Sequence, residues 1–441
     1  MRRKKTNCIY FFFMLFFCVT DSLWSQTTTD ALGSFTPYSM FGIGEVAKTG
    51  SAINHSMGGI GVGVRDPRYI NFVNPAAITA REIKAFMLDF GTEGQNIYLS
   101  DAQTSSAFNT FNMHHVAISF PLYHKTAMLL GITPYSHTGY KFEQKEYSPE
   151  MVSDLGDIAY RHYGEGGISQ AILGVATPLF KHWSVGAQAI YYFGAIHRHS
   201  DLMFITPSSY RSLQTGYDVV VGSFSGKFGL QYERQMKNNY TLSAGASYLL
   251  SSDLKGDATR YAFARSTSVK DTIYLERMNN AQMKIPGAFA AGISFGKKQR
   301  EDDVVNRWMI GFDYSRQDWS RSTFAPTLGI DFKPVVSSSF RAGFEVTPNL
   351  YDTRYVYKHW TYRGGVYYEQ TYLMLNNTRI NAGGFSFGVS IPVQHWANLF
   401  NFGIDLGQRG STDNRLVRER YVVFQIGISL YDLWFVKFRY D

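Results

Sequence analysis

The fold is decided by an alternating stretch near the C-terminus, VVFQIGISL at residues 422–430. Apolar side chains occupy every second position there, and the positions between them include glutamine, glycine and serine. A period of two predicts a β-strand, and a second face of small and polar side chains suits a water-facing barrel interior. The same pattern recurs along the chain, for example at 224–232, 242–250, 285–295, 340–346 and 400–406.

Several alternating segments are longer than ordinary soluble strands, because they exceed the roughly 9–11 residues that cross a bilayer at a tilt. Long links between them alternate with short ones, which is typical of outer-membrane barrels whose long loops face the outside. The sequence therefore predicts an all-β transmembrane antiparallel β-barrel of about 14 strands. We place the spans near 82–91, 112–120, 126–134, 168–177, 183–197, 222–234, 240–251, 284–296, 306–318, 338–347, 360–372, 379–392, 398–409 and 418–430, with long links at 92–111, 135–167, 198–221 and 252–283.

The composition of the 441 residues agrees with this prediction, since 16% are aromatic and 18% charged. A disordered chain would not carry so many aromatics, and a helical membrane bundle would need repeated apolar runs of about 20 residues. Six tryptophans beyond residue 25 fall at predicted strand ends or turns, where an aromatic girdle meets the lipid headgroups. They are Trp183, Trp308, Trp319, Trp360, Trp396 and Trp434.

The N-terminus has the order of a secretory signal peptide, with basic residues 2–5, an apolar stretch 8–19 and a small residue at Ser25. We predict removal of residues 1–25, which also removes both cysteines and excludes disulfides and cysteine metal sites from the mature chain. Loss of four basic residues and Asp21 lowers the formal net charge from +8 to +5. The basic cluster 297–300 is followed at once by acidic residues, so no nucleic-acid partner is expected.

Residues 26–81 do not alternate and are rich in glycine, as in the stretch MGGIGVG at 57–63. We predict that they form an N-terminal hatch, or plug, folded into the lumen of a barrel that occupies residues 82–441. The glycine run lacks the lysine and the strand-then-helix context of a phosphate-binding loop. No cofactor is expected.

Short motifs place the chain near a known family. Gly58-Gly59 is followed by Asn74-Pro75-Ala76-Ala77 just before the first span, and the strand pattern then continues to the C-terminus. With these features the sequence resembles the FadL-like outer-membrane proteins, which transport long-chain fatty acids and aromatic hydrocarbons. The opening Pro37-Tyr38-Ser39 looks most like the Bacteroidetes-type branch.

The resemblance implies a hatch-plugged barrel in the outer membrane of a Gram-negative bacterium. It also implies passive uptake of hydrophobic small molecules such as long-chain fatty acids, with lateral release through a kink in the third strand. Gly131 and Pro134 lie in the third span here, so we hypothesise that they mark that opening; the alternative is that Pro134 only ends the strand. The junction Asn74, Pro75, Ala76 and Ala77 would hold the hatch, although Asn-Pro is also an ordinary turn signal.

Catalytic and metal chemistry have weak support. His197 and His199 share a strand face but lack further ligands, whereas His114 and His115 are expected to point to opposite faces. We therefore predict neither an enzyme nor a metal site. Polar residues on the inward face are expected to form a network that stiffens the wall and holds the hatch, among them Asp313, Arg341, Glu345, Arg363, Glu369 and Asp405.

The expected partners are outer-membrane lipid, a hydrophobic small-molecule ligand and, during assembly, the barrel-insertion machinery that recognises an aromatic terminal strand. An alternative function shares every one of these features: a non-transporting structural or assembly barrel that is the protein partner of a secretion or gliding complex. A general porin is disfavoured because a plugged lumen would not pass solutes freely.

Overall fold

The computed structural model describes residues 33–101, 104–145, 148–205, 210–265, 270–298, 307–322, 324, 332–350, 352, 354–393 and 395–433. The predicted signal peptide, and the aromatic C-terminal residues 434–441, lie outside the described residues. None of the helices in the described ranges is long and apolar enough to cross a membrane.

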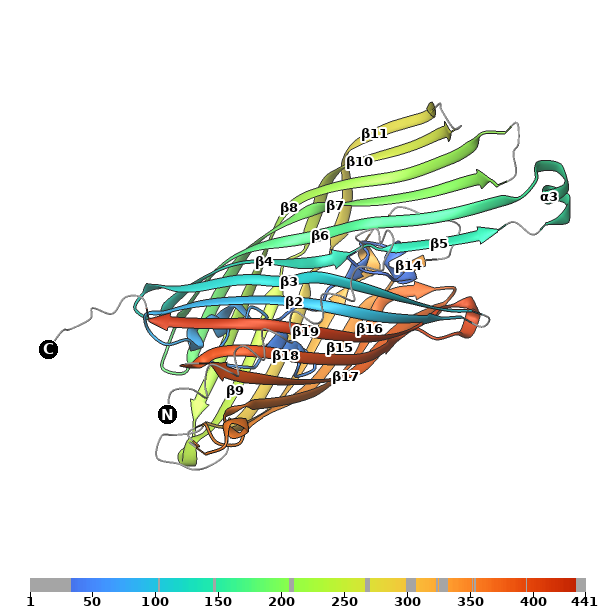
Figure 1. Ribbon diagram of the computed structural model, residues 1–441. Helices are drawn as coiled ribbons and strands as arrows, with labels where there is room; N and C mark the ends of the chain where they lie inside the picture. The colour runs from blue at the N-terminus through green and yellow to red at the C-terminus, as the bar shows by residue number, and fades with distance from the viewer. Residues whose placement is uncertain are drawn as a thin grey trace, which may run out of the picture. The chain divides into compact units, whose positions relative to one another are not determined.

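Fourteen antiparallel spans close into a barrel (Figure 1). Ten spans are single strands: β2 (Ala85–Ser100), β3 (Ser105–Tyr123), β6 (Ile158–Pro178), β7 (Trp183–Phe204), β8 (Ser212–Gln235), β13 (Arg307–Asp318), β16 (Thr361–Leu375), β17 (Thr378–Val393), β18 (His395–Arg409) and β19 (Arg418–Leu433). Four are interrupted: β4 (Thr126–His137) with β5 (Tyr140–Lys145), β9 (Tyr240–Leu249) with β10 (Ser252–Arg265), β11 (Lys270–Ile285) with β12 (Ala288–Lys297), and β14 (Phe332–Pro334) with β15 (Val336–Thr347). The last strand, β19, pairs with β2 over its whole length and closes the barrel. The predicted architecture is confirmed.

The predicted outer loops were wrong in length. Strands β2 and β3 are joined by residues 101–104, β7 and β8 by residues 205–211, and β10 and β11 by residues 266–269. These strand ends extend past the lipid, as the exposed Asp253, Lys255 and Asp257 on β10 indicate. The apolar alternation on which the prediction depended is required only where a strand faces lipid, so these extensions lack it.

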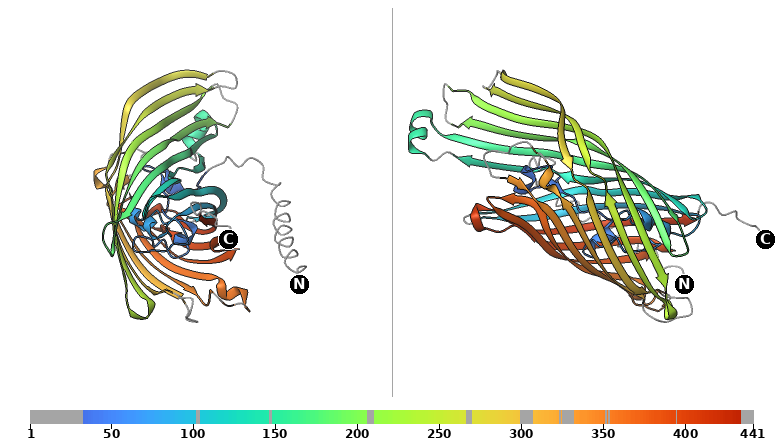
Figure 2. Two further views of the ribbon diagram at one scale, coloured as in Figure 1. Left: turned by 90° about the vertical axis from the view of Figure 1, so that its left-hand side faces the viewer. Right: turned by 180° about the vertical axis from the view of Figure 1, so that it is seen from behind.

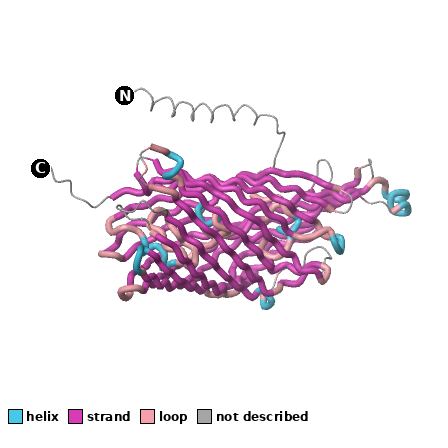
Figure 3. The backbone as a smooth tube through the Cα atoms, turned by 90° about the horizontal axis from the view of Figure 1, so that it is seen from below, coloured by secondary structure: helices cyan, strands magenta, loops and turns pink. Residues whose placement is uncertain are grey.

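The exterior carries a belt of exposed apolar side chains, including Phe111, Phe224 and Phe385. The strands run obliquely to the long axis of the barrel (Figure 3), as closure of a barrel demands. Trp183 begins β7 at the rim and is exposed, as an interfacial anchor should be. Trp319 was wrongly placed in the girdle: it is 1% exposed and stacks on Tyr372 inside the barrel, with ring centroids 4.7 Å apart. Trp434 and the side chain of Trp396 lie outside the described residues.

The N-terminal segment, defined here as residues 33–84, lies inside the barrel (Figure 2, blue). It contains only short elements: η2 (Pro37–Met40), β1 (Glu45–Val46), α2 (Ala52–His55) and η3 (Pro75–Ala80). The first barrel strand begins at Ala85, and the division into a hatch at 26–81 and a barrel at 82–441 stays a prediction.

Inward-facing glycines allow the N-terminal segment to touch the wall backbone. A Cβ atom placed on Gly365 would lie 2.2 Å from the carbonyl carbon of Met57, and one on Gly245 would lie 2.0 Å from the carbonyl oxygen of Val62. From β19 back to β7, the segment contacts successive strands in an order that runs, with one reversal at Gly63 and Val62, from Ala52 to Pro75. The wall glycines in this series, which we call the glycine belt, are Gly427, Gly403, Gly388, Gly365, Gly343, Gly311, Gly292, Gly245, Gly229 and Gly186.

Candidate functional site

A buried ion cluster anchors the N-terminal segment near the end of the lumen where β2 begins and β19 ends, which is the periplasmic end of an outer-membrane barrel of even strand number. Arg68 Nη2 lies 2.7 Å from Asp66 Oδ2 and 2.6 Å from Glu345 Oε1. Arg307 on β13 reaches the same Asp66 oxygen at 2.6 Å, and Arg363 on β16 binds Glu345 at 2.8 Å. Arg68 and Glu345 are 2% and 1% exposed. We call these five residues the arginine cluster; it joins the segment to three strands.

A second anchor uses backbone groups of the segment. The Asp313 carboxylate on β13 accepts hydrogen bonds from the amides of Gly61 and Val62 at 2.6 and 2.7 Å. Arg65 binds Glu233 on β8 at 2.7 Å near the rim. These contacts satisfy polar groups that the packed lumen would otherwise leave without partners.

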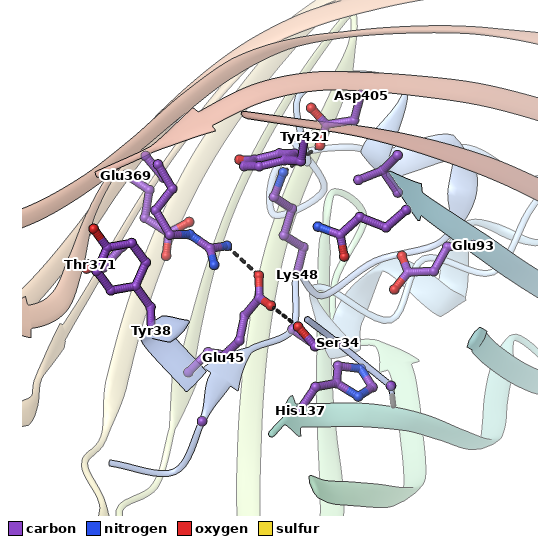
Figure 4. Close-up of a pocket in the computed structure, with 18 of the residues that line it drawn as sticks. Ser34, Tyr38, Glu45, Lys48, Glu93, His137, Glu369, Thr371, Asp405 and Tyr421 are labelled. Atoms are coloured by element: carbon purple, nitrogen blue, oxygen red, sulfur yellow. Dashed lines mark hydrogen bonds and ion pairs between the residues drawn. The ribbon is translucent and has the colours of Figure 1, made fainter. Parts of the chain in front are cut away.

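A cavity of about 100 Å³, which we call the polar chamber, lies between the segment and the strands β2, β3, β16, β18 and β19 (Figure 4). Lys48 Nζ lies 2.5 Å from Asp405 Oδ2 and 3.7 Å from the centre of the Tyr367 ring. Glu45 is paired with Arg409 and accepts a hydrogen bond from the Ser34 hydroxyl at 2.7 Å. Two ion pairs in the chamber thus join the segment to β18.

Carboxylates outnumber the cations around the chamber. Glu45, Glu93, Glu369 and Asp405 line it together with Lys48 and Arg409. Burial alone would lower the pKa of Lys48, but the Asp405 carboxylate raises it above its ordinary value. Burial would likewise raise the pKa of Glu45, and the Arg409 guanidinium holds it below its ordinary value. Fixed charges of this density make the chamber a poor host for an apolar molecule.

The prediction that His114 and His115 point to opposite faces was wrong. A β-bulge in β3 shifts the register opposite Gly91 and Thr92, and both side chains point inward. Their Nδ1 atoms lie 2.9 Å apart, and His115 Nε2 lies 2.8 Å from Asp89 Oδ1. Strict alternation of side chains fails wherever a bulge inserts an extra residue.

We expect the anchoring of the N-terminal segment to weaken in two steps as the pH falls. Burial and the neighbouring His114 and Lys48 lower the pKa of His55 well below its ordinary value, so stability declines once the pH falls below about 6.5, where a free imidazole protonates. Burial opposes the ionisation of Asp66, but the Arg307 and Arg68 guanidinium groups outweigh burial and lower the pKa of Asp66. The pKa of Glu45 is also lowered. The two carboxylates therefore stabilise the fold above about pH 4, where free carboxyl groups ionise, and this stabilisation is lost as the pH falls further.

The measurement is the free energy of unfolding in urea between pH 8 and pH 3. His55 accepts a hydrogen bond from Gln425 Nε2 at 2.7 Å in its neutral form, and His55→Gln should make the decline between pH 7 and 5 shallower, because it removes one imidazole that is buried without charge. A wild-type profile that is flat between pH 7 and 5 would contradict the role given to His55.

The barrel wall has a gap between β3 and β4. Pairing of the two strands runs from Tyr123–Thr126 to Val116–Ile132. Beyond that point β5 pairs with β6, and among the described residues no ladder joins residues 105–115 of β3 to β4 or β5. Gly131 lies in the last paired stretch, and Pro134 lies beside a register shift in the β4–β6 ladder. Their assignment to a lateral opening stays a prediction.

The N-terminal segment fills this gap. Strand β1 pairs with Ser136 and His137 of β4, and the Thr36 amide donates to the Gly139 carbonyl at 2.8 Å. Phe35 stacks on Phe108 of β3 with ring centroids 3.5 Å apart. A cavity of about 200 Å³, the gap pocket, is lined by Phe35, Leu99, Phe108, Tyr140, Phe142 and Val417 among others.

The predicted junction residues lie against β7, β8 and β9. Asn74 caps η3 by accepting from the Ala76 amide at 3.0 Å, and its Nδ2 group donates to the carbonyls of Val62 and Leu230 at 2.9 and 3.2 Å. Pro75, Ala76 and Ala77 are buried within η3. This geometry is that of a structural clamp, and any further role of the junction stays a prediction.

The structure places the six predicted inward residues in two groups. Glu345, Arg363 and Asp313 hold the N-terminal segment, as described above. Asp405 and Glu369 line the polar chamber, and Arg341 lines an adjoining cavity of about 200 Å³ near Gly59. Sequence reasoning missed Lys48, Asp66 and Arg68; charged residues inside a glycine-rich, mildly apolar segment were the available signal.

His197 and His199 do not lie in a metal-binding group. His197 Nδ1 lies 3.0 Å from Asp218 Oδ1, and His199 contacts the Tyr261 hydroxyl. In the described part of the chain, no set of three or more His, Cys, Asp or Glu side chains is arranged to hold a metal ion.

Comparison with known proteins gives a family and a fold. A family model described as BamG matches residues 6–441, and no curated protein matches the chain. Similar solved structures include the CymD monoaromatic hydrocarbon channel (17% identity, TM-score 0.53, covering 86% of this chain and 97% of that one). The toluene transporter TbuX of Ralstonia pickettii (15%, 0.53, 87% and 98%) and a FadL homologue of Pseudomonas aeruginosa (13%, 0.53, 88% and 100%) are also similar.

The closed barrel and its apolar belt therefore define an outer-membrane protein of a Gram-negative bacterium with the fold of the FadL-like hydrocarbon transporters. Within that class, the chain belongs to the BamG family. The Bacteroidetes-type branch stays a prediction. The similar solved structures are channels and transporters by name, but at 13–17% sequence identity the similarity shows only that the fold is shared.

Proposed function

We propose that this protein is a non-transporting outer-membrane barrel that acts as a structural component of barrel assembly in the envelope. The observation that carries the proposal is the N-terminal segment, which buried ion pairs and hydrogen bonds fix inside the lumen. The arginine cluster and Asp313 fix the N-terminal segment to the wall, and the chamber above them is lined by ion pairs. The name of the family, BamG, points to the barrel-assembly machinery.

A lumen of this kind disfavours passage of hydrophobic molecules. An apolar solute crossing the polar chamber would have to displace Lys48 from Asp405 or Arg409 from Glu45. Both pairs are partly buried, with Lys48 29% and Glu45 16% exposed, so separating either of them leaves poorly solvated charge in the lumen, which is unfavourable. The barrel is therefore better suited to present fixed surfaces to other proteins than to conduct.

The test is depletion of the protein in its native host. We expect the amounts of other folded outer-membrane barrels to fall, measured by quantitative proteomics of outer membranes, while uptake of labelled toluene and of labelled long-chain fatty acid stays unchanged. Expression of the wild-type chain should restore the barrels. Unchanged barrel amounts together with lost uptake would overturn the proposal.

The second candidate function is passive uptake of hydrophobic small molecules with lateral release into the membrane. It is favoured by the gap between β3 and β4, which lies beside Gly131 and Pro134 and has an apolar pocket at its outer end. Its test is uptake of labelled long-chain fatty acid by cells carrying Pro134→Ala. Reduced uptake would support the channel, and wild-type uptake would argue against lateral release at this strand.

A further inference from the structure

Three turns share an unusual composition at the end of the barrel where β2 begins and β19 ends, the end that faces the periplasm in barrels of this kind. Residues 122–125 read Leu-Tyr-His-Lys, residues 179–182 read Leu-Phe-Lys-His, and residues 236–237 read Met-Lys. They connect β3 to β4, β6 to β7 and β8 to β9. Because these strands are consecutive in the barrel sheet, the three turns are neighbours along one stretch of the rim (Figure 1).

The apolar side chains of these turns are strongly exposed. Tyr123 is 71% exposed and Phe180 is 69% exposed, and Leu122, Leu179 and Met236 are also exposed. Ile83, which precedes β2 at the same end, extends the series. We call this surface the rim arc; it comprises Ile83, Lys84, residues 122–125, residues 179–182, Arg234 and residues 236–237.

The charged side chains of the rim arc are all basic. Lys84, Lys125, Lys181, Arg234 and Lys237 are all exposed. The nearby acid Glu233 is already paired, with Arg65 and Lys298. In the part of the chain that the structure describes, Glu82 and Asp432 are exposed acids beside the arc. An apolar surface bordered by five cations favours an apolar partner that carries acidic groups.

Lipid does not account for the whole arc. Trp183 at the start of β7 marks the headgroup layer, and backbone hydrogen bonds join it to Leu179 and Phe180 at 2.9 and 3.3 Å, so only Lys181 and His182 form the tip of this turn. Tyrosine and lysine suit that layer, but Leu122, Leu179, Phe180 and Met236 lack the polar end with which tyrosine and tryptophan meet headgroups. Large exposed apolar patches with polar borders mark protein interfaces.

We propose that the rim arc is the docking surface for an acidic segment of a periplasmic protein that inserts apolar side chains between the three turns. The partner would cover Tyr123 and Phe180 and pair its carboxylates with Lys125, Lys181 and Lys237. This docking surface gives the chemistry of a protein partner and so deepens the proposed function. It rests on the proposed function for one point, that such a partner exists.

The test is photo-crosslinking in living cells with p-benzoylphenylalanine introduced at Phe180 of the full chain. Val356, in the link between β15 and β16, is the matched control because it is apolar and also 69% exposed. We expect crosslinks from position 180, and none from position 356, to one periplasmic protein, mapped by mass spectrometry to a segment rich in Asp and Glu. The triple variant Lys125→Glu, Lys181→Glu, Lys237→Glu should lower the yield about tenfold.

Heat-modifiable migration of the triple variant on gels checks that its barrel still folds. Crosslinks to lipid alone, to residues 434–441 of the chain or to a second copy would overturn the inference, as would equal yields from positions 180 and 356. Loss of other barrels on depletion, combined with any of these results, would refute the docking surface and leave the proposed function standing.

Discussion

Glu345→Gln is expected to lower the free energy of unfolding by about 3–5 kcal/mol, the range seen when one partner of a buried ion pair is removed. Glu345 accepts from Arg68 at 2.6 Å and from Arg363 at 2.8 Å, and Arg307 lies 3.2 Å from it. Glutamine has nearly the same shape as glutamate but no charge, so Asp66 would be the one carboxylate left in the arginine cluster to balance three guanidinium groups. The measurement is equilibrium unfolding in urea in phospholipid vesicles, followed by tryptophan fluorescence.

The charge argument is separated from a simple loss of packing by a second substitution. Glu345→Gln combined with Arg363→Gln restores the original charge balance of the cluster, so part of the lost stability should return. Glu233→Gln is the control at a partly exposed pair and should cost less than about 1 kcal/mol. Equal losses at Glu345 and Glu233, or no recovery in the double variant, would contradict this account.

The strands could be predicted where lipid imposes a pattern. Stretches such as 422–430 alternate because one face meets the bilayer, and each of them became a span. The outer halves of β7, β8, β10 and β11 face water on the outside, so nothing forces alternation and the same residues were assigned to loops. The sequence therefore locates the lipid belt of each strand and underestimates the length of the strand.

For the barrel interior, the sequence predicts which residues face inward but not which residues they contact. Inward polar residues such as Asp313 and Glu345 follow from strand parity, but their partners Gly61 and Arg68 are more than 200 positions away and come from a segment without a period. The β-bulge at His114 and the inward turn of Trp319 depend on tertiary packing. The sequence shows that the chain has 40 glycines. That ten of them form the glycine belt can be seen only from the path of residues 52–76 along the wall.

That path makes Gly365 a sensitive position in the wall. Its α-carbon faces the backbone of Met57 and Gly58, with 2.2 and 2.3 Å between a Cβ atom and the nearest atoms of each. No rotamer relieves a clash with backbone, so Gly365→Leu should displace the N-terminal segment while the ladders to β15 and β17 stay intact. Overpacking of this kind costs about 1–3 kcal/mol or more, which corresponds to roughly 5- to 150-fold more of the displaced state.

Trypsin digestion of the folded variant measures this displacement, since Arg65 and Arg68 are shielded in the wild type and would become cleavable. Gly383→Leu is the matched control: this glycine lies on the adjacent strand β17, where the nearest atom to a Cβ is 3.4 Å away. We expect faster cleavage at Arg65 and Arg68 in Gly365→Leu alone, with heat-modifiable migration retained in both variants. If Gly365→Leu resists trypsin as well as the wild type does, the segment does not depend on the glycine belt, and close backbone contact cannot be what holds the lumen shut.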